Sequence, residues 1–207
     1  DIIKQLDLQN PTVLISSFDR ANIKYFVQPK QAVLHHIVQY LNEHPNDSGI
    51  IYCLSRKGTE DMANNLKENG VNAAFYHAGI SSTERAKVQD DFIKDKIRVM
   101  VATIAFGMGI DKSNVRFVIH ADLPKNIESY YQETGRAVRD GLPSEAILFY
   151  SNADVMKLKK FALIEGNEEQ STLMLKKLQH MTDFAEMQKC RRQYLMEYFG
   201  ESHPGNC

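Results

Sequence analysis

Short, nearly continuous hydrophobic runs recur along the first 150 residues of this chain. Continuous rather than alternating hydrophobicity is typical of strands that are buried on both faces, as in a parallel sheet. The pattern therefore predicts a parallel sheet in this part of the chain. The runs that we interpret as its strands are 49–54, 71–76, 97–103, 115–120 and 146–150.

Hydrophobic residues at helical spacing lie between these runs, around residues 33–41, 62–66, 88–92 and 127–131. Gly70 stands where a helix C-cap is expected, and Ser81 with Glu84 has the spacing of a capping box at a helix start. Alternating strands and helices predict an α/β domain with right-handed crossovers. The pattern places this domain at about residues 20–150, after a lead-in segment of residues 1–19.

The pattern changes after Tyr150. No strand-like run follows, and hydrophobic residues keep helical spacing around residues 174–185 and 194–199. The polar stretch 165–172 is interpreted as a linker. A small helical appendage is therefore expected from about residue 168 to residue 207.

Composition changes this picture little. The 207 residues carry a formal net charge of −1, so charge alone does not predict nucleic-acid binding. No apolar run approaches the ~18 residues that span a bilayer, and we expect no membrane partner. Three cysteines indicate a reducing compartment rather than a disulfide framework. Because the chain opens at Asp1 rather than at Met, we expect it to be part of a longer protein.

Two motifs of nucleotide hydrolysis are missing from the sequence. It contains no Gly-x-x-x-x-Gly-Lys-Ser/Thr phosphate loop and no Asp-Glu-x-His box for Mg²⁺. Without a phosphate cradle and a metal-binding carboxylate, this chain is not expected to hydrolyse ATP unaided.

Two arginines stand three residues apart in the block 132–141, QETGRAVRDG. Arg136 and Arg139 at this spacing can converge on one anion, although an isolated Arg-x-x-Arg pair is usually a solvated helix face. Together with the earlier block 102–111, ATIAFGMGID, they resemble motifs V and VI of superfamily 2 helicases. The resemblance makes the chain similar to the half of an ATP-driven motor that supplies an arginine finger.

Further segments narrow the resemblance to the RecQ family of DNA helicases. They are SFDRANIKY at 17–25, IIYCLSR at 50–56, FYHAG at 75–79 and CRRQYLMEYFGE at 190–201. The resemblance implies that residues 20–160 form a RecA-like lobe, a parallel sheet flanked by helices. It also implies that residues 168–207 form the first part of the family's zinc-binding subdomain.

The resemblance assigns a nucleotide role to several residues. Arg139 stands where the family places its arginine finger, and Arg136 where a companion phosphate contact lies. Gly109 and Asp111 match the turn that approaches the sugar of the nucleotide. Gln132 matches a position that relays contacts across the cleft between the lobes.

Other interpretations of these residues stay open. Both arginines would be ordinary surface cations if they paired with Glu133 and Asp140. For Asp111, the separate alternative is the role of a helix cap. The sequence also departs from the family at Val138, where glycine usually separates the two arginines. Glycine there permits a positive φ or a close backbone approach, which valine tolerates poorly.

Polar residues follow three of the predicted strands, and ligands of open α/β sheets gather at this edge. In related motors the rim holds the phosphate backbone of single-stranded DNA through hydroxyl and main-chain N–H groups, which requires no basic patch. Loop capping without DNA contact is the alternative for each. The DNA-binding candidates are Ser55, Arg56, His77, Gly79 and Thr103.

Four residues of the same region are interpreted as packing residues. Cys53 lies within a predicted buried strand and is expected to be unreactive. His120 lies on another predicted strand, and Tyr130 and Tyr131 have the helical spacing of core positions.

Cys190 and Cys207 are the candidate metal ligands. By its distance from Cys190, Cys207 matches the second ligand of the family's zinc pattern. By the residues next to it, Gly-Asn-Cys, it matches the third ligand instead, and Pro204 then stands at the position of the second. A closed Zn²⁺ site needs four ligands and only two thiolates are present, unless His203 substitutes. We therefore expect an incomplete zinc site.

The sequence is thus interpreted as the C-terminal motor lobe of an ATP-dependent, 3′-to-5′ DNA helicase that uses ATP, Mg²⁺ and Zn²⁺. The expected partners are single-stranded and duplex DNA and an N-terminal RecA-like lobe of the same protein, which we expect to be a monomer. DNA repair and recombination are the expected processes, in the cytoplasm and nucleoid of a bacterium or the nucleus of a eukaryote. The alternatives are another superfamily 2 motor, such as an RNA helicase, and a non-catalytic DNA-binding or scaffolding module.

Overall fold

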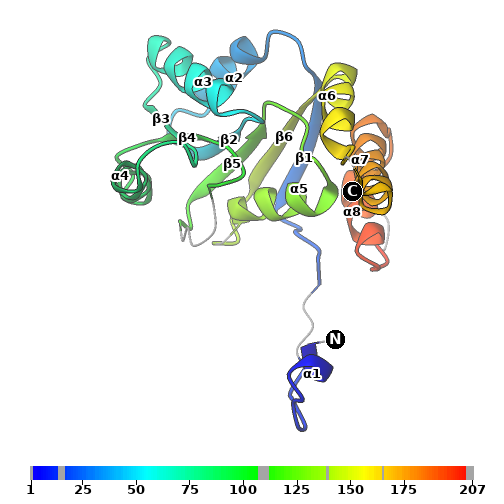
Figure 1. Ribbon diagram of the computed structural model, residues 1–207. Coiled ribbons are helices and arrows are strands. Elements are labelled where there is room, and N and C mark those ends of the chain that lie inside the picture. The colour runs from blue at the N-terminus through cyan, green and yellow to red at the C-terminus, as the bar shows by residue number, and fades with distance from the viewer. Residues whose placement is uncertain (1, 14–16, 107–111, 139, 165, 204–207) are drawn as a thin grey trace.

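A parallel six-stranded sheet forms the centre of the computed structural model, which describes residues 2–13, 17–106, 112–138, 140–164 and 166–203 (Figure 1). The strand order is β1-β6-β5-β2-β4-β3, and every adjacent pair is parallel. The predicted α/β fold is therefore confirmed. The strands are β1 (Ile23–Pro29), β2 (Ser48–Tyr52), β3 (Ala73–Tyr76), β4 (Val99–Ala102), β5 (Val115–His120) and β6 (Ser144–Tyr150).

Helices cover both faces of this sheet (Figure 1). Ile51 of β2 packs with α2 and α3, whereas the neighbouring Ile50 packs with Phe92 of α4 and with Ala137 of η1. Alternate residues of the central strand are thus buried on opposite faces, which explains its continuous hydrophobicity. The helices are α1 (Ile2–Gln5), α2 (Val33–Glu43), α3 (Arg56–Glu68), α4 (Ser82–Ile93), α5 (Ile127–Thr134), η1 (Gly135–Val138), α6 (Asn152–Ala162), α7 (Glu168–Glu186) and α8 (Arg191–Tyr198).

Strand β1 was not among the predicted strands. It lies at the edge of the sheet and pairs only with β6. Ile23 is fully buried, but most of the following residues are partly or fully exposed, and Phe26 keeps 40% of its surface accessible. An edge strand of this kind lacks the continuous hydrophobic run by which the inner strands were recognised.

The local signals at helix ends are confirmed. Gly70 has a φ of 78° directly after the C-cap of α3, and its N–H donates to the Lys67 carbonyl. The N–H of Val71 donates to the Leu66 carbonyl, which completes a Schellman motif that ends α3. At the start of α4, the Ser81 hydroxyl accepts a hydrogen bond from the Glu84 N–H at 3.1 Å.

The predicted linker at 165–172 is wrong for most of its length, because α7 begins at Glu168. The Asn167 side chain caps this helix by accepting a hydrogen bond from the Gln170 N–H at 2.9 Å. Glu168 and Glu169 occupy the first turn, where negative charge is favourable next to the helix dipole. The polarity that suggested a linker therefore belongs to a helix start.

Helices α6, α7 and α8 pack against the sheet domain. Tyr130 of α5 is fully buried and joins Leu148 of β6 in one core with Leu158, Phe184 and Leu195 of the three later helices. The predicted core role of Tyr130 is confirmed, whereas Tyr131 is only partly buried and its hydroxyl donates to the Phe18 carbonyl at 2.8 Å. Across the described part of the chain, no helix combines the length and hydrophobicity that a membrane span requires.

Candidate functional site

Strands β2, β3 and β4 each end next to a predicted DNA-binding residue. After β2, the exposed Ser55 is the N-cap of α3, and its hydroxyl accepts a hydrogen bond from the Gly58 N–H at 3.0 Å. Arg56 is the first residue of this helix and is exposed. After β4, the Thr103 N–H donates to the Tyr76 carbonyl at 3.2 Å. The candidates therefore share the edge at which the parallel strands end.

His77 connects the loop after β3 to α3. Its side chain is only 3% exposed, and Nδ1 accepts a hydrogen bond from the Gly79 N–H at 3.1 Å. Its Nε2 lies 2.8 Å from a carboxylate oxygen of Glu60. Since Nδ1 accepts from an N–H, the ring proton belongs on Nε2, where it is donated to Glu60. His77 thus orders this loop and is too buried for a direct contact with a large ligand.

Gly79 lies closely against two other candidates. A Cβ atom at this position would be 3.0 Å from His77 Nδ1 and 3.3 Å from Cδ of Arg56. Both contacts are tighter than ordinary van der Waals packing. The structure therefore brings Arg56, His77 and Gly79 into one cluster, with the exposed Arg56 guanidinium free to reach solvent-side anions.

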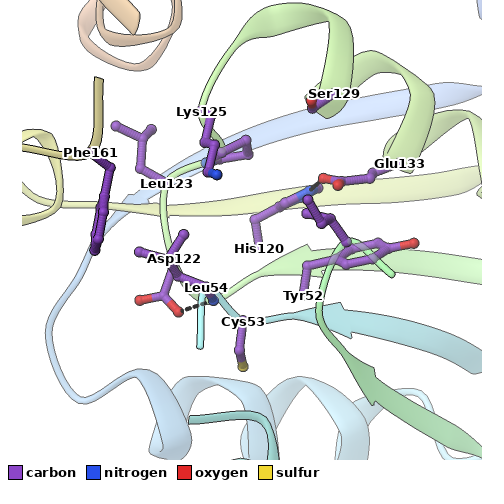
Figure 2. A pocket seen from close by; sticks show the side chains of 12 residues that line it. Tyr52, Cys53, Leu54, His120, Asp122, Leu123, Lys125, Ser129, Glu133 and Phe161 are labelled. Atoms are coloured by element: carbon purple, nitrogen blue, oxygen red, sulfur yellow. Dashed lines mark hydrogen bonds and ion pairs between the residues drawn. The ribbon is translucent and has the colours of Figure 1, made fainter. Parts of the chain in front are cut away.

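A hollow of about 240 Å³ opens at the same edge, where β2 and β5 end (Figure 2). Cys53 contributes to its wall, but burial raises the pKa of the Cys53 thiol to about 12, which keeps it protonated and unreactive, as predicted. The residues that line the hollow are Tyr52, Cys53, Leu54, Ile104, His120, Asp122, Leu123, Pro124, Lys125, Ser129, Glu133 and Phe161.

Asp122 accepts hydrogen bonds from two other segments at this edge of the sheet, and the sequence interpretation did not identify it. One of its oxygens accepts a hydrogen bond from the Leu54 N–H at 2.7 Å, directly before Ser55 (Figure 2). Its other oxygen accepts from the Lys30 ammonium at 2.5 Å, and Lys30 also donates to Asp154 of α6 at 2.7 Å. An acidic residue two positions beyond a buried strand was the available signal, since such residues line ligand edges.

Three predicted nucleotide-site residues, Gly109, Asp111 and Arg139, lie outside the described residues. Gln132 lies exposed on α5, and Arg136 lies on η1, half-buried. The Tyr52 hydroxyl donates to the Phe106 carbonyl at 3.2 Å, in the loop after β4. Burial raises the pKa of Tyr52, and the neighbouring Arg136 guanidinium opposes that rise. Tyr52 therefore connects the two segments that resemble motifs V and VI.

The carboxylates that were possible surface partners of the two arginines have other partners. Glu133 is 6% exposed and lies 2.7 Å from Nε2 of His120, which is itself buried (Figure 2). Asp140 forms an ion pair with Arg116 of β5. His120 is therefore a structural residue, as predicted, and it joins the end of β5 to the helix before Arg136.

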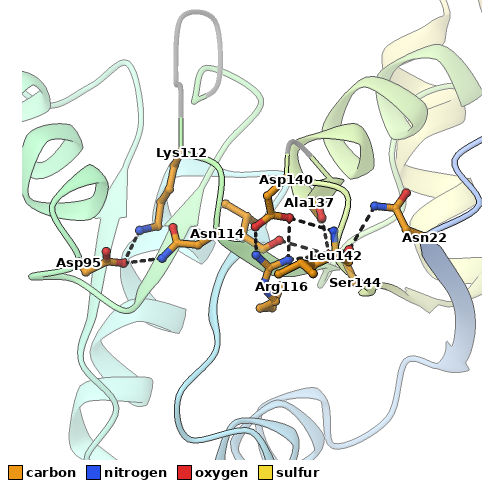
Figure 3. A network of polar contacts seen from close by, with 10 residues as sticks. Asn22, Asp95, Lys112, Asn114, Arg116, Ala137, Asp140, Leu142 and Ser144 are labelled. Atoms are coloured by element: carbon orange, nitrogen blue, oxygen red, sulfur yellow. Dashed lines mark hydrogen bonds and ion pairs between the residues drawn. The ribbon is translucent and has the colours of Figure 1, made fainter.

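Two ion pairs flank the loops that resemble motifs V and VI (Figure 3). Lys112 is almost completely buried, lies 2.5 Å from Asp95 and sits over the Phe92 ring at 5.0 Å. Arg116 pairs with Asp140 near the start of β5. Neither pair was predicted, because the partners are distant in sequence.

Cys190 is the N-cap of α8, where its sulfur accepts a hydrogen bond from the Gln193 N–H at 3.4 Å. Cys207 lies outside the described residues. Within the described ranges, no three His, Cys, Asp or Glu side chains gather in a way that could hold a metal ion. The geometry of Cys190 therefore does not by itself define a zinc site.

Comparison with known proteins decides the family. Residues 30–141, more than half of the chain, match the helicase conserved C-terminal domain. The chain belongs to this family. Residues 152–207 match the RecQ zinc-binding domain. The two matches follow each other in the order that the sequence motifs predicted, and the chain corresponds to the C-terminal lobe of RecQ helicases plus the start of their zinc-binding region.

Curated relatives support the same placement. The chain is 50% identical over 207 residues to the ATP-dependent DNA helicase RecQ of Pasteurella multocida, covering 100% of this chain and 33% of that protein. It is 45% identical over 210 residues to the RecQ-like DNA helicase BLM of Xenopus laevis, covering 98% of this chain and 15% of the relative. The chain thus spans about a third of the length of the bacterial relatives that it matches.

The fold also matches a solved helicase structure. A DEAD box protein from Methanococcus jannaschii superposes with a TM-score of 0.58 at 30% identity, covering 68% of this chain and 39% of the other. This likeness, together with the parallel six-stranded sheet and its flanking helices, confirms the predicted RecA-like fold.

Proposed function

We propose that this chain is the C-terminal motor lobe of an ATP-dependent helicase that unwinds DNA in the 3′-to-5′ direction. The observation that carries the proposal is the arrangement of two separate candidate surfaces on one lobe. Ser55, Arg56 and Gly79 lie where β2 and β3 end, whereas Arg136 lies on η1 and is joined through Tyr52 to the loop after β4. One lobe can thereby present one surface to DNA and another to nucleotide.

On the DNA surface, exposed groups rather than buried ones would make the contacts. The Ser55 hydroxyl, the Arg56 guanidinium and the main chain near Gly79 suit phosphate oxygens, which bind N–H and hydroxyl donors. His77 would act indirectly, because its two ring nitrogens already bind Gly79 and Glu60. DNA is favoured over RNA because the bacterial, Xenopus and Arabidopsis relatives with whole-chain similarity are named DNA helicases, whereas a relative from Acanthamoeba polyphaga mimivirus, at 42% identity, is named a putative ATP-dependent RNA helicase.

On the nucleotide surface, this lobe would supply positive charge. Arg136 and Arg139 would approach the phosphates of ATP when the N-terminal lobe of the same protein closes on this one, with Gln132, Gly109 and Asp111 in supporting contacts. ATP supplies the phosphoryl group whose hydrolysis drives movement, and Mg²⁺ would be held mainly by the other lobe. The chain alone, without a phosphate loop, would be inactive.

In the zinc-binding region, Cys190 and Cys207 would supply two thiolate ligands of a structural Zn²⁺ site, which takes four. Such a site cross-links a short segment and contributes directly to its folding. The complete protein would act as a monomer on single-stranded and duplex DNA, in DNA repair and recombination. Its location would be the cytoplasm and nucleoid of a bacterium or the nucleus of a eukaryote.

Replacing Arg56 by alanine in the full-length protein should weaken binding to single-stranded DNA about tenfold or more, because a charge-assisted hydrogen bond to phosphate contributes about 1.5–3 kcal/mol. ATP binding should be unchanged. Fluorescence anisotropy with a labelled oligonucleotide measures the first, and a nucleotide titration the second. Lys57→Ala is the matched control, since Lys57 is also exposed in the first turn of α3.

Strand displacement tests the activity itself. The full-length protein with ATP and Mg²⁺ should unwind a DNA duplex with a 3′ single-stranded tail and leave a 5′-tailed duplex intact, whereas the isolated 207-residue chain should hydrolyse no ATP. Equal losses of DNA affinity in Arg56→Ala and Lys57→Ala would reject the DNA surface. Preferential unwinding of an RNA duplex would replace the DNA assignment with that of an RNA helicase.

A further inference from the structure

Arg116 is buried enough to hold one geometry and reaches across to the segment that follows η1. Its side chain is 17% exposed and that of Asp140 is 23% exposed. One guanidinium nitrogen donates to Asp140 Oδ1 at 3.1 Å, and the other donates to Oδ2. This two-pronged pairing fixes orientation as well as distance. The same hydrogen bonds lower the pKa of the Asp140 carboxyl, so it stays charged at neutral pH.

Other contacts hold the same segment within the same network (Figure 3). The Ser144 hydroxyl donates to the carbonyl of Ala137, which is fully buried. The Leu142 N–H donates to Asp140 at 3.1 Å, and the Asn22 side chain donates to the Leu142 carbonyl at 3.1 Å. Ala137 is thereby held by Ser144 of β6, and Asp140 is held by Arg116 of β5. These two contacts fix the chain just before and just after the two residues 138 and 139.

We infer that Arg116 is a positioning residue that, through Asp140, sets where the chain presents Arg139 to the nucleotide. The inference rests on the proposed function, in which Arg139 is the arginine finger. Arg139 is bonded directly to Asp140, so any shift of the Asp140 backbone displaces the start of the Arg139 side chain. A shift of about 1 Å in a catalytic group can cost about 10²-fold in rate, whereas it changes ground-state affinity little.

The pairing also explains why arginine rather than lysine would be required at position 116. A lysine ammonium can keep the charge attraction, but it cannot bind both carboxylate oxygens in one plane. Strand β5 is central in the sheet, with β6 and β2 on its two sides, so the guanidinium starts from a rigid base. The role assigned to Arg116 is therefore to fix the segment that carries Arg139, through Asp140.

The test combines Arg116→Gln and Arg139→Ala, singly and together, in the full-length protein. We expect Arg116→Gln to lower DNA-stimulated ATP turnover about tenfold or more while the KM for ATP changes less than about twofold. In the Arg139→Ala background, Arg116→Gln should cause no further loss, because residues that act through one another are non-additive. A purely structural residue would lower turnover by the same factor in both backgrounds.

Two further variants keep the test decisive. Asp140→Asn should reproduce the loss of turnover, and Arg116→Lys should recover only part of it if Arg116→Gln folds poorly. Asp90→Asn is the control, since it breaks an exposed ion pair with Lys94 on α4 and should leave turnover unchanged. Unchanged turnover in Arg116→Gln, or multiplicative losses in the double variant, would overturn the inference while leaving the finger role of Arg139 intact. Unchanged turnover in Arg139→Ala alone would instead reject the proposed function and the inference together.

Discussion

Replacing Arg139 by alanine in the full-length protein should lower ATP turnover and unwinding by about 10³-fold or more, the range measured for arginine fingers. The proposed role of its guanidinium is to neutralise charge that develops on the transferring phosphoryl group. Such an interaction is stronger in the transition state than in the ground state, so the loss should fall on kcat rather than on binding. Steady-state ATPase rates beside nucleotide and single-stranded DNA titrations measure both quantities.

Two comparisons sharpen this prediction. Arg139→Lys should recover little activity, because an ammonium cannot reproduce the planar donor fork of a guanidinium. Arg85→Ala removes an arginine from α4, outside the segments proposed to bind nucleotide, and should leave the rate within about twofold. A loss in Arg139→Ala of less than about threefold would return Arg139 to the role of an ordinary surface cation.

Burial on two faces explains why most of the sheet was predictable. The inner strand β5 has the bounds Val115–His120 that its hydrophobic run predicted. Strand β1 was missed because an edge strand buries only part of its residues, so the buried Ile23 is followed only by exposed and half-buried positions, Phe26 among the exposed ones. The start of α7 was misinterpreted for a related reason, because capping residues and loop residues have the same polar composition.

The candidate site was predictable in part. Motif spacing identified the segments, and the structure places Ser55, Gly79 and Thr103 at the predicted edge of the sheet. The contact between Leu54 and Asp122, which holds the start of the Ser55 loop, was not predictable, because these two residues meet only through the pairing of β2 with β5. Such contacts depend on strand order, which the periodicity of a single chain does not encode.

Gly49 shows how strongly this packing constrains the central strand. It pairs in register with Phe117 of β5, and a Cβ atom at position 49 would lie 2.2 Å from the Phe117 ring. The ring is fully buried and also meets Tyr40 of α2 edge-on at 5.4 Å between centroids. Phe117 therefore covers the space that a side chain at position 49 would need, and it has little room to move aside.

Replacing Gly49 by alanine should therefore destabilise the protein by about 3 kcal/mol, at the upper end of the usual overpacking cost. At about 2–4 °C per kcal/mol for a domain of this size, the apparent Tm should fall by about 6–12 °C. Thermal unfolding of the full-length protein, followed through the transition of this lobe, measures the change.

Two variants separate this clash from a general effect of losing glycine. Gly135→Ala is the matched control, since its φ of −61° is helical and no atom lies within 4 Å of the added Cβ, so its Tm should stay within about 2 °C. Combining Gly49→Ala with Phe117→Leu should destabilise less than the sum of the two single changes, because the smaller side chain vacates the space that the new methyl group needs. Strict additivity, or a Gly49→Ala variant as stable as Gly135→Ala, would contradict this prediction. Either result would show that the Phe117 ring can move aside without lowering the free energy of unfolding, so that packing does not require glycine at position 49.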